Sequence, residues 1–531
     1  MPYLDWLIFF GFFKEGVEDL ANIRKDLWGR TKLTSTMPET LDKKAVTQIL
    51  NDVAETHQTN SEQSDYLYWY RRGNQPILER PKPIRPEIKN YVLENRAAEF
   101  VEFYKGYQFS HPILYTNAGE NESKPIGVLN AYARLDGKES KDSDMSDFMF
   151  TCGTSYRLTL PVDEQDVDDA PYFTTVLDPR NTFVVYSNDV TEKAILAGTA
   201  VLKKIDDQEY KIYSVYTTTM FYKFKLKADE KDFEKADVEE ESNGLGMIPI
   251  IEFPLNSNRL GVVELCYHLF NAINNVGSNR VDGIEQFVQA LLVFINCELP
   301  PLVDKDGKPL LGTNGQPLKM IPKSGDAIDI KGNGTLTPDV KYLIAQLDQS
   351  QAQVTKEDLL NAAYEVAGVP SRADRRSGGD TGQAVMLRDG WGAAESRAKT
   401  TEKSFKKSER EYLKIVLRIC RDTQSASQEI GDLALRDIGI SFQRTRSDNM
   451  LVKAQTFQIL NDAGVHFETC AETSELFYDP AAVTAKSLKW QEESAQWVEK
   501  RLKMANKLSG DLSGEPEVVD TGITEKLERK D

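Results

Sequence analysis

Two long stretches of helical periodicity, Gly261–Asn296 and Asp339–Gly368, are separated by about forty residues that cannot form a helix. The separator contains the turn-forming pairs Pro300-Pro301, Asp306-Gly307 and Asn314-Gly315. Thirty-odd helical residues reach roughly 50 Å, because each adds about 1.5 Å, and few single domains are that wide. Two such helices with a turn-rich segment between them favour a protein that builds a stalk or the wall of a channel over a compact enzyme.

The composition is that of a soluble folded protein with room for about two to four domains. Of its 531 residues, 40% are hydrophobic and 28% are charged. A formal charge of −18 at pH 7 argues against a broad basic face that binds nucleic acid. Either a well-solvated surface or a surface that does not adhere to polyanions explains this acidity, and the sequence leaves both open.

Cysteine and histidine residues are too scattered to form a disulfide framework or a metal site. The five cysteines include no C-x-x-C pair, and the four histidines lie equally far apart. We therefore expect a reducing compartment and no metal or other cofactor. The residues concerned are Cys152, Cys266, Cys297, Cys420, Cys470, His57, His111, His268 and His466.

An apolar, aromatic run extends from Leu4 to Phe13 and contains Asp5. It is too short to span a bilayer and no basic residue precedes it, so we expect neither a transmembrane helix nor a signal peptide. Docking onto the chain's own core or onto a neighbouring subunit is the preferred interpretation. No other stretch of the sequence predicts a membrane-spanning segment.

Helical patterns precede a strand-rich region in the first half of the chain. Helices are expected at Thr40–Asn60 and Pro86–Tyr104, where apolar residues recur on one face. Residues 105–255 are expected to be mostly strand, with a charged loop or hairpin tip at Ala228–Gly246. The expected strands are Phe148–Leu160, Tyr172–Tyr186, Ala194–Lys203, Tyr210–Thr219, Phe221–Lys227 and Ile248–Phe253.

The last third of the chain is expected to be largely helical. A helix over residues 383–422 contains Gly390-Trp391-Gly392, where a kink is expected. Residues Ile438–Arg446 alternate like a strand, and the chain from Met450 onward is helical again. The charged segment after Ser509 is expected to be disordered.

Motifs for catalysis are nearly absent. The segment Gly378–Gln383 lacks the lysine with which a nucleotide-binding loop reaches phosphates. Asp-Thr-Gly occurs twice, beginning at Asp380 and Asp520, and aspartic proteases use two such turns to oppose two carboxylates. That chemistry needs rigid, buried strand turns, whereas Asp380 precedes a helix and Asp520 lies in a charged tail. An aspartic-type hydrolase is therefore the enzyme alternative, and the context of both residues argues against it.

Arginine residues form one localised basic cluster, Arg372, Arg375 and Arg376, in a glycine-flanked loop between helices. The cluster is either a solvated loop or a mobile finger that makes weak, salt-sensitive contacts with phosphates. Structural roles are expected for Arg71-Arg72 and for Arg444 and Arg446, which adjoin aromatic or strand segments.

The aromatic run Tyr66, Tyr68, Trp69 and Tyr70 could stack nucleic-acid bases or pack in a core or interface. Its spacing favours packing.

Several strings occur in an order that is typical of one family. They are Tyr70–Arg80, Asn95–Tyr115, Asp178–Tyr186, Gly246–Asn256, three pieces of the first long helix (Asn271–Asn274, Ser278–Asp282 and Glu285–Phe294) and Ile440–Arg446. Together they resemble the portal proteins of tailed bacteriophages, and most closely the head-to-tail connectors of siphophages. The resemblance covers roughly residues 45–500, so the aromatic N-terminus and the tail lie outside it.

The resemblance implies an α+β portal fold with a fixed order of parts. The parts are an N-terminal extension (1–40), a wing of helices followed by β-rich structure (41–255), two stem helices (256–296 and 339–368) flanking an α/β clip (297–338), a tunnel loop (369–382), a long kinked helix with a wing strand (383–447), a helical crown (448–508) and a disordered tail (509–531).

The resemblance also implies a ring, typically of twelve subunits, at one vertex of the phage head. Double-stranded DNA would be packaged and ejected through it, beside the tunnel-loop residues Arg372, Arg375 and Arg376. The clip would dock the terminase large subunit and the head–tail adaptor. The clip residues that carry this expectation are Asp304, Lys305, Lys308, Lys319 and Lys323.

Further partners implied by the resemblance are the major capsid and scaffolding proteins, with assembly in the host bacterial cytoplasm, a final place in the virion and no membrane association. The acidity then acquires a physical reason, because a basic channel would bind duplex DNA tightly and stall it. No enzymatic activity is expected. A ring-forming scaffold that never meets DNA remains the second alternative.

Overall fold

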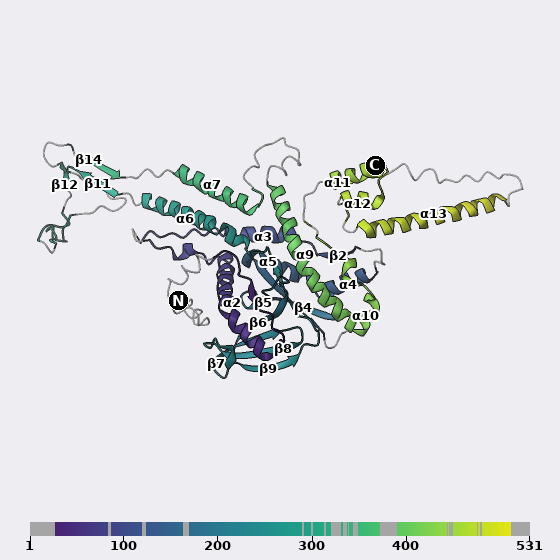
Figure 1. Cartoon of the computed structure of the whole chain (residues 1–531). Coiled ribbons are helices and arrows are strands. Elements are labelled where there is room, and N and C mark those ends of the chain that lie inside the picture. The colour runs from purple at the N-terminus through teal and green to yellow at the C-terminus, as the bar shows by residue number, and fades with distance from the viewer. Residues whose placement is uncertain are drawn as a thin grey trace. The chain divides into compact units, whose positions relative to one another are not determined.

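The structure is a computed structural model that describes most of the chain as separate helices, strands and loops (Figure 1). The described residues are 27–82, 86–118, 124–162, 169–288, 291–298, 301–312, 315–319, 331–332, 337, 339–343, 349–371, 390–442, 444, 450–474, 476–477 and 480–510. They form two compact units. The first comprises Met1–Gly106, Ser143–Leu158 and Thr175–Glu409, and the second comprises Tyr107–Asp142, Thr159–Thr174 and Arg410–Asp531. Helices and strands both contribute heavily, which confirms the α+β class.

A six-stranded sheet and one long helix build the main core of the first unit. The strands are ordered β1-β5-β6-β7-β8-β9, and only β1 and β5 pair in parallel. Their bounds are β1 Leu33–Ser35, β5 Thr182–Ser187, β6 Ala194–Ile205, β7 Gln208–Tyr216, β8 Met220–Lys227 and β9 Asp237–Ser242. The helix is α2 (Lys43–Arg71), whose N-cap Asp42 accepts a 2.8 Å hydrogen bond from the backbone N–H of Ala45.

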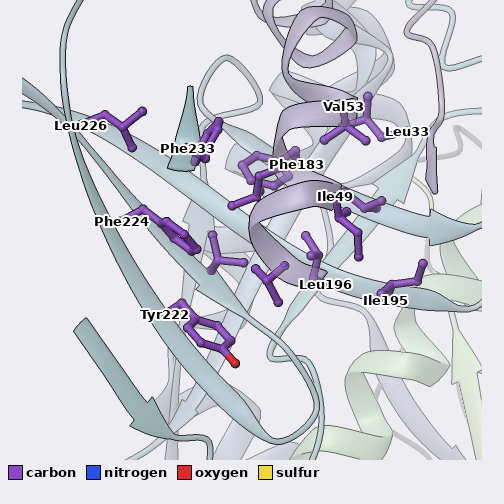
Figure 2. Close-up of a cluster of buried hydrophobic side chains, with 14 residues drawn as sticks. Leu33, Ile49, Val53, Phe183, Ile195, Leu196, Tyr222, Phe224, Leu226 and Phe233 are labelled. Carbon is purple, nitrogen blue, oxygen red and sulfur yellow. The ribbon is translucent and has the colours of Figure 1, made fainter. Parts of the chain in front are cut away.

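The core lies where the apolar face of α2 meets the sheet (Figure 2). Ile49 and Val53, one helical turn apart, point at strand residues such as Phe183 and Leu196. Successive side chains of a strand point to opposite faces, so every second residue faces the helix. Period-four apolar spacing in the helix and period-two spacing in the strands therefore bury one common layer. Three predicted strands of this sheet are confirmed to within a few residues, namely Ala194–Lys203, Tyr210–Thr219 and Phe221–Lys227.

A second, three-stranded sheet has the order β10-β3-β4. It contains β3 (Thr154–Pro161), β4 (Tyr172–Leu177) and β10 (Ile250–Pro254). The single expected strand Tyr172–Tyr186 is in fact two, because Asp178-Pro-Arg-Asn181 forms a turn between β4 and β5.

Two helices occupy a region that was expected to be mostly strand. They are α4 (Lys124–Leu135) and α5 (Lys138–Cys152). The prediction was wrong here because the buried residues of α4, Ile126, Leu129 and Ala133, follow the helical spacing of three and four. The supposed loop Ala228–Gly246 contains edge strand β9, whose acidic side chains keep an exposed sheet edge from pairing with other chains.

The second unit is mainly helical. Its short sheet pairs β2 (Leu114–Asn117) with β15 (Ile438–Ser441), and α10 (Gln424–Ile430) contacts α4. The last three helices are α11 (Met450–Asp462), α12 (Phe467–Ser474) and α13 (Pro480–Gly510), which confirms the helical prediction for the C-terminal region.

The helix α9 (Trp391–Asp422) begins at the tryptophan of the expected kink, and residues 383–389 lie outside the described part of the chain. Within the ranges given above, no helix combines the length and the apolar character that crossing a bilayer requires.

Candidate functional site: a helix pair, its strap and its tip

The two expected long helices exist, but both are shorter than the sequence suggested. They are α6 (Val262–Val288) and α7 (Gln349–Ala367), which contact each other along their length. Arg280 of α6 donates a 2.6 Å hydrogen bond to the side-chain oxygen of Gln353 in α7. The stretch Leu291–Ile295 is strand β11, and Asp339–Leu343 is strand β14, so the helical prediction was wrong at both ends.

β11 and β14 pair in antiparallel fashion, from Leu291 with Leu343 to Ile295 with Asp339 (Figure 1). A run of leucine, valine, phenylalanine and isoleucine fits both a buried helix and a strand, and here the strand pairing is adopted. A shorter pair, β12 (Cys297–Glu298) with β13 (Lys331–Gly332), continues the ribbon. The protein thus prolongs its helix pair with a two-stranded ribbon.

One face of α6 carries a row of polar side chains, at sequence intervals of three, four, four and three. The row consists of Asn271, Asn274, Ser278, Asp282 and Glu285. Asn274, Ser278 and Asp282 are almost completely buried. Buried polar groups are stable only when they are hydrogen-bonded, so this row requires a partner that follows α6.

That partner is an extended segment, residues 90–95, which we call the strap. The backbone N–H groups of Asn90, Val92 and Glu94 donate to Asp282 Oδ1, Ser278 Oγ and Asn274 Oδ1 at 2.8, 2.9 and 2.9 Å. Two extended residues span about 6.6 Å and four helical residues about 6 Å. Every second N–H of the strap therefore meets every fourth residue of the helix.

The strap explains why the predicted helix Pro86–Tyr104 begins only at Arg96, as α3 (Arg96–Gln108). Its backbone donors are taken by α6 side chains and not by a helical ladder. Gly277 lies within α6, where the strap packs against the helix. A Cβ on Gly277 would stand 3.2 Å from Val92 Cγ1, so the glycine permits the close approach of the strap.

Charged groups tie the strap region to both helices. Asp282 Oδ2 accepts a 2.6 Å hydrogen bond from Lys82 Nζ, and Arg80 lies 3.4 Å away. Burial raises the pKa of Asp282, but hydrogen bonds from Lys82 and from the Asn90 N–H outweigh it and leave the pKa below its ordinary value. Glu94 is ion-paired with Lys356 of α7 in the same way.

The tip beyond the ribbon is built from an eight-residue repeat that the sequence analysis missed. Proline and leucine recur together at Pro301-Leu302, Pro309-Leu310 and Pro317-Leu318, with Asp306-Gly307 and Asn314-Gly315 at matching places between them. The prolines occupy antiparallel bridge positions, opposite Lys319, Val303 and Leu311 respectively. Their missing N–H is not needed at these non-hydrogen-bonded positions.

The three leucine backbones close a ring of hydrogen bonds. Leu310 donates to the carbonyl of Leu302, Leu318 to that of Leu310, and Leu302 to that of Leu318, each at 2.7 Å. Their side chains are 41, 42 and 48% exposed, which are nearly equal values. With the half-exposed Val303 and Leu311 they form an apolar surface that we call the leucine tip. Exposed apolar surfaces are a common feature of protein interaction sites.

Four of the five predicted clip residues adjoin the leucine tip: Asp304, Lys305, Lys308 and Lys319. Lys305, Lys308 and Lys319 are exposed, whereas Asp304 has a structural role. Asp304 Oδ1 accepts the N–H groups of Asp306 and Lys308, each at 2.9 Å, and thereby fixes the first turn. Spacing alone could have revealed the leucines, because the repeat of Pro-Leu every eight residues is visible in the sequence.

Several predicted site residues lie outside the described residues. They are Lys323 of the clip, Arg372, Arg375 and Arg376 of the tunnel loop, and the aspartates Asp380 and Asp520 of the hydrolase alternative. Neither the tunnel loop nor the aspartate pair is therefore tested.

The aromatic run packs against the protein, as predicted, with Tyr70 in the interior and Tyr66, Tyr68 and Trp69 half-buried. Tyr70 is fully buried, and its hydroxyl donates a 3.0 Å hydrogen bond to Asn271 of the α6 row. Tyr68 stacks on Phe148, and Arg72 lies 4.2 Å from the Tyr68 ring. Arg71 is ion-paired with Glu102 at 2.6 Å and with Asp147. These two arginines are structural.

Within the described ranges, no cluster of three His, Cys, Asp or Glu residues could hold an ion. Cys152, Cys266, Cys420 and Cys470 are buried free thiols, and burial raises the pKa of the first three. A cavity beside His57 measures about 20 Å³, room for a single water molecule.

Comparison with known proteins assigns the chain to a family. The sequence profile of one family, phage portal protein, SPP1 Gp6-like, matches residues 49–500. The chain belongs to this phage portal protein family. Portal proteins are structural components of the virion at the capsid vertex, where they connect head and tail. The matched range contains the strap, both helices, the ribbon and the leucine tip.

Comparisons with solved structures and with curated proteins give less information than the family profile. A chain from the neck of an empty GTA particle, computed with C6 symmetry, is similar to this portal chain at 10% identity with a TM-score of 0.37. The similarity covers 75% of the portal chain and 95% of that chain. No curated protein matches the sequence.

Proposed function

We propose that the protein assembles into a ring, of twelve subunits, that forms a channel for double-stranded DNA at one capsid vertex. The observation that carries the proposal is the helix pair α6–α7, prolonged by the β11–β14 ribbon, within a chain of the portal family. In a ring, twelve such pairs side by side would form the wall of a channel. The net charge of −18 per chain would then keep the duplex from adhering to that wall.

The proposed stem consists of α6 and α7, and the proposed clip consists of the ribbon and the leucine tip. The clip would face outward and dock first the terminase large subunit and later the head–tail adaptor. The lysines Lys305, Lys308 and Lys319 around the leucine tip would supply a charged rim to an apolar centre, as in other protein interfaces. The C-terminal helices would form a crown, and capsid and scaffolding proteins would meet the wing.

A structural role without catalysis suits this arrangement. The family is a structural one, and the cavity beside His57 is too small for a substrate. Energy for DNA movement would come from a separate motor.

Ring assembly is the first test. Purified protein is expected to form particles with a central hole in negative-stain images and a mass near 720 kDa, from twelve copies of 60.0 kDa. Native mass spectrometry gives the subunit number. A stable 60 kDa monomer at micromolar concentration, with or without scaffolding protein, would contradict the proposal.

The tunnel-loop hypothesis has a separate test. Replacing Arg372, Arg375 and Arg376 by alanine is expected to reduce the amount of DNA packaged per head while rings form normally. Each arginine would contact phosphates weakly, and salt screens such contacts, so the loss should be largest at low salt and should shrink as the salt concentration rises. Packaging at the wild-type level would remove the loop from the mechanism and favour the alternative of a ring that never handles DNA.

A further inference from the structure

A row of six basic residues follows one exposed face of α9. Their intervals of four, four, three, four and four residues keep them on a single face of an α-helix. Because α9 is one uninterrupted helix, helix geometry alone sets the length of the row, about 28 Å. We call this row the α9 basic stripe, and it consists of the exposed residues Lys399, Lys403, Lys407, Arg410, Lys414 and Arg418.

The outer members of the stripe are paired, but only loosely. Lys399 lies 3.7 Å from Glu395, and Arg418 lies 2.9 Å from Asp422, one helical turn away in each case. Lys414 is 2.7 Å from Glu411. Exposed pairs of this kind contribute about 0.3–0.5 kcal/mol, so a stronger anion can displace the carboxylate.

The centre of the stripe carries uncompensated charge. Within the described ranges, no carboxylate lies within ion-pairing distance of Lys403, Lys407 or Arg410. Lys407 does lower the pKa of the Glu192 carboxyl through its charge, but the larger cause is Glu192's own hydrogen bond to Lys32. That ion pair has an N–O distance of 2.7 Å.

Of the three glutamates next to this centre in sequence, Glu402 pairs with Lys406, Glu411 pairs with Lys414, and Glu409 is turned inward. Glu409 is fully buried, and its carboxylate lies 3.1 Å from a guanidinium nitrogen of the equally buried Arg157. A buried pair cancels its own charge locally. Glu409 therefore does not offset the positive charge of the outward face.

The same face offers no apolar anchor. No large apolar side chain of α9 is exposed, because its phenylalanine, leucine, isoleucine and valine residues are all buried. Protein interfaces derive most of their affinity from buried aromatic and apolar anchors at the centre. Positive charge without such anchors favours a phosphate backbone over a protein surface.

We propose that the α9 basic stripe binds the phosphate backbone of duplex DNA without sequence preference. Its length equals the axial rise of roughly eight base pairs, and its charges recur about every 6 Å. In a chain of net charge −18, such a row is a local track on a surface that otherwise repels DNA. The proposal rests on the proposed function only in taking DNA as the polyanion. The stripe would be a second DNA-contacting site, separate from the proposed tunnel loop.

The test compares two triple variants of the full-length protein in salt titrations with a fluorescent 12-base-pair DNA hairpin. The stripe variant is Lys403→Gln, Lys407→Gln, Arg410→Gln. The control is Lys203→Gln, Lys227→Gln, Lys231→Gln, which removes the same charge from exposed lysines of the first unit. Fluorescence anisotropy from 50 to 200 mM salt gives the slope of log affinity against log salt.

The stripe variant is expected to lower that slope by about 2.7, because each lost phosphate contact removes about 0.9. The control should keep the wild-type slope. Equal slopes in the two variants would overturn the proposal, even if negative-stain images show rings and the proposed function stands. Tight binding of poly-glutamate with no binding of the DNA hairpin would also overturn it, in favour of an acidic protein partner. Failure of the wild type to form rings would instead count against the proposed function.

Discussion

Replacing Asp282 by alanine is expected to lower the thermal midpoint of the first unit by roughly 5 °C, a loss of about 3 kcal/mol. The Asp282 side chain receives the Lys82 ammonium and the Asn90 backbone N–H, and its replacement would leave both donors without an acceptor. Loss of a buried charged acceptor costs more than loss of a neutral one, because the donors keep their desolvation penalty. Differential scanning fluorimetry of the full-length protein measures the shift.

The effect should depend on pH in a defined direction. The folded-state pKa of Asp282 is depressed, so its contribution to stability is fully present above the ordinary aspartate pKa, near 3.8. It is lost as pH falls through the lower folded-state value. Wild type and variant are therefore expected to differ most at neutral pH and to converge in strong acid.

Asp358→Ala provides the matched control. Asp358 is an exposed carboxylate on α7, so its removal changes the net charge equally without leaving a buried donor. Its midpoint should lie within about 1 °C of the wild type. Equal shifts for Asp282→Ala and Asp358→Ala would show that the strap is not held by its hydrogen bonds to α6.

Replacing Leu302, Leu310 and Leu318 together by serine is expected to weaken docking of motor or adaptor about a thousandfold. A leucine buried in an interface contributes about 1.5 kcal/mol, and about 1.4 kcal/mol corresponds to a factor of ten. In complementation of a phage that lacks its own portal gene, the plaque titre should fall by at least about a hundredfold. The backbone ring should persist, because serine retains the same N–H and carbonyl groups.

A second triple variant controls for the loss of exposed leucines as such. Leu135, Leu202 and Leu488 are 54, 53 and 53% exposed and lie far from the tip in sequence. Changing them to serine should leave the titre unchanged. If the leucine-tip variant forms rings and still gives wild-type titres, the leucine tip is not the docking surface.

Local patterns predicted much of this fold, since period-two and period-four apolar spacing identified most strands of the six-stranded sheet and the helix α2. The errors have a common physical cause. The strap was taken for a helix because its apolar residues have helical spacing, yet side chains of α6, almost two hundred positions later in the sequence, claim its N–H groups. Leu291–Ile295 suits helix and strand alike, and its partner Asp339–Leu343 decides. The local sequence of a segment does not reveal a pairing partner that lies far away in the chain.

The candidate site, formed by the helix pair, the strap and the leucine tip, could also be predicted only in part, because local patterns do not reveal distant partners. The turn-rich segment between the helices was recognised from its proline and glycine pairs, and its charged residues were expected to matter. The strings Asn271–Asn274 and Ser278–Asp282 were used only as evidence of the family resemblance. The structure shows their physical role, because they contain the buried acceptors for the backbone N–H groups of the strap. The eight-residue Pro-Leu repeat that forms the leucine tip is present in the sequence, but it was not recognised as a repeat.

The closed ring of leucine backbones has a consequence for a protein that exists in many copies at one place. β-Hairpins normally offer unpaired edges, and identical edges held close together add to one another and aggregate. In the tip, the N–H groups and carbonyls of Leu302, Leu310 and Leu318 are consumed within the same chain. In the proposed ring, these three leucines of neighbouring tips could therefore meet through their side chains but not through backbone pairing.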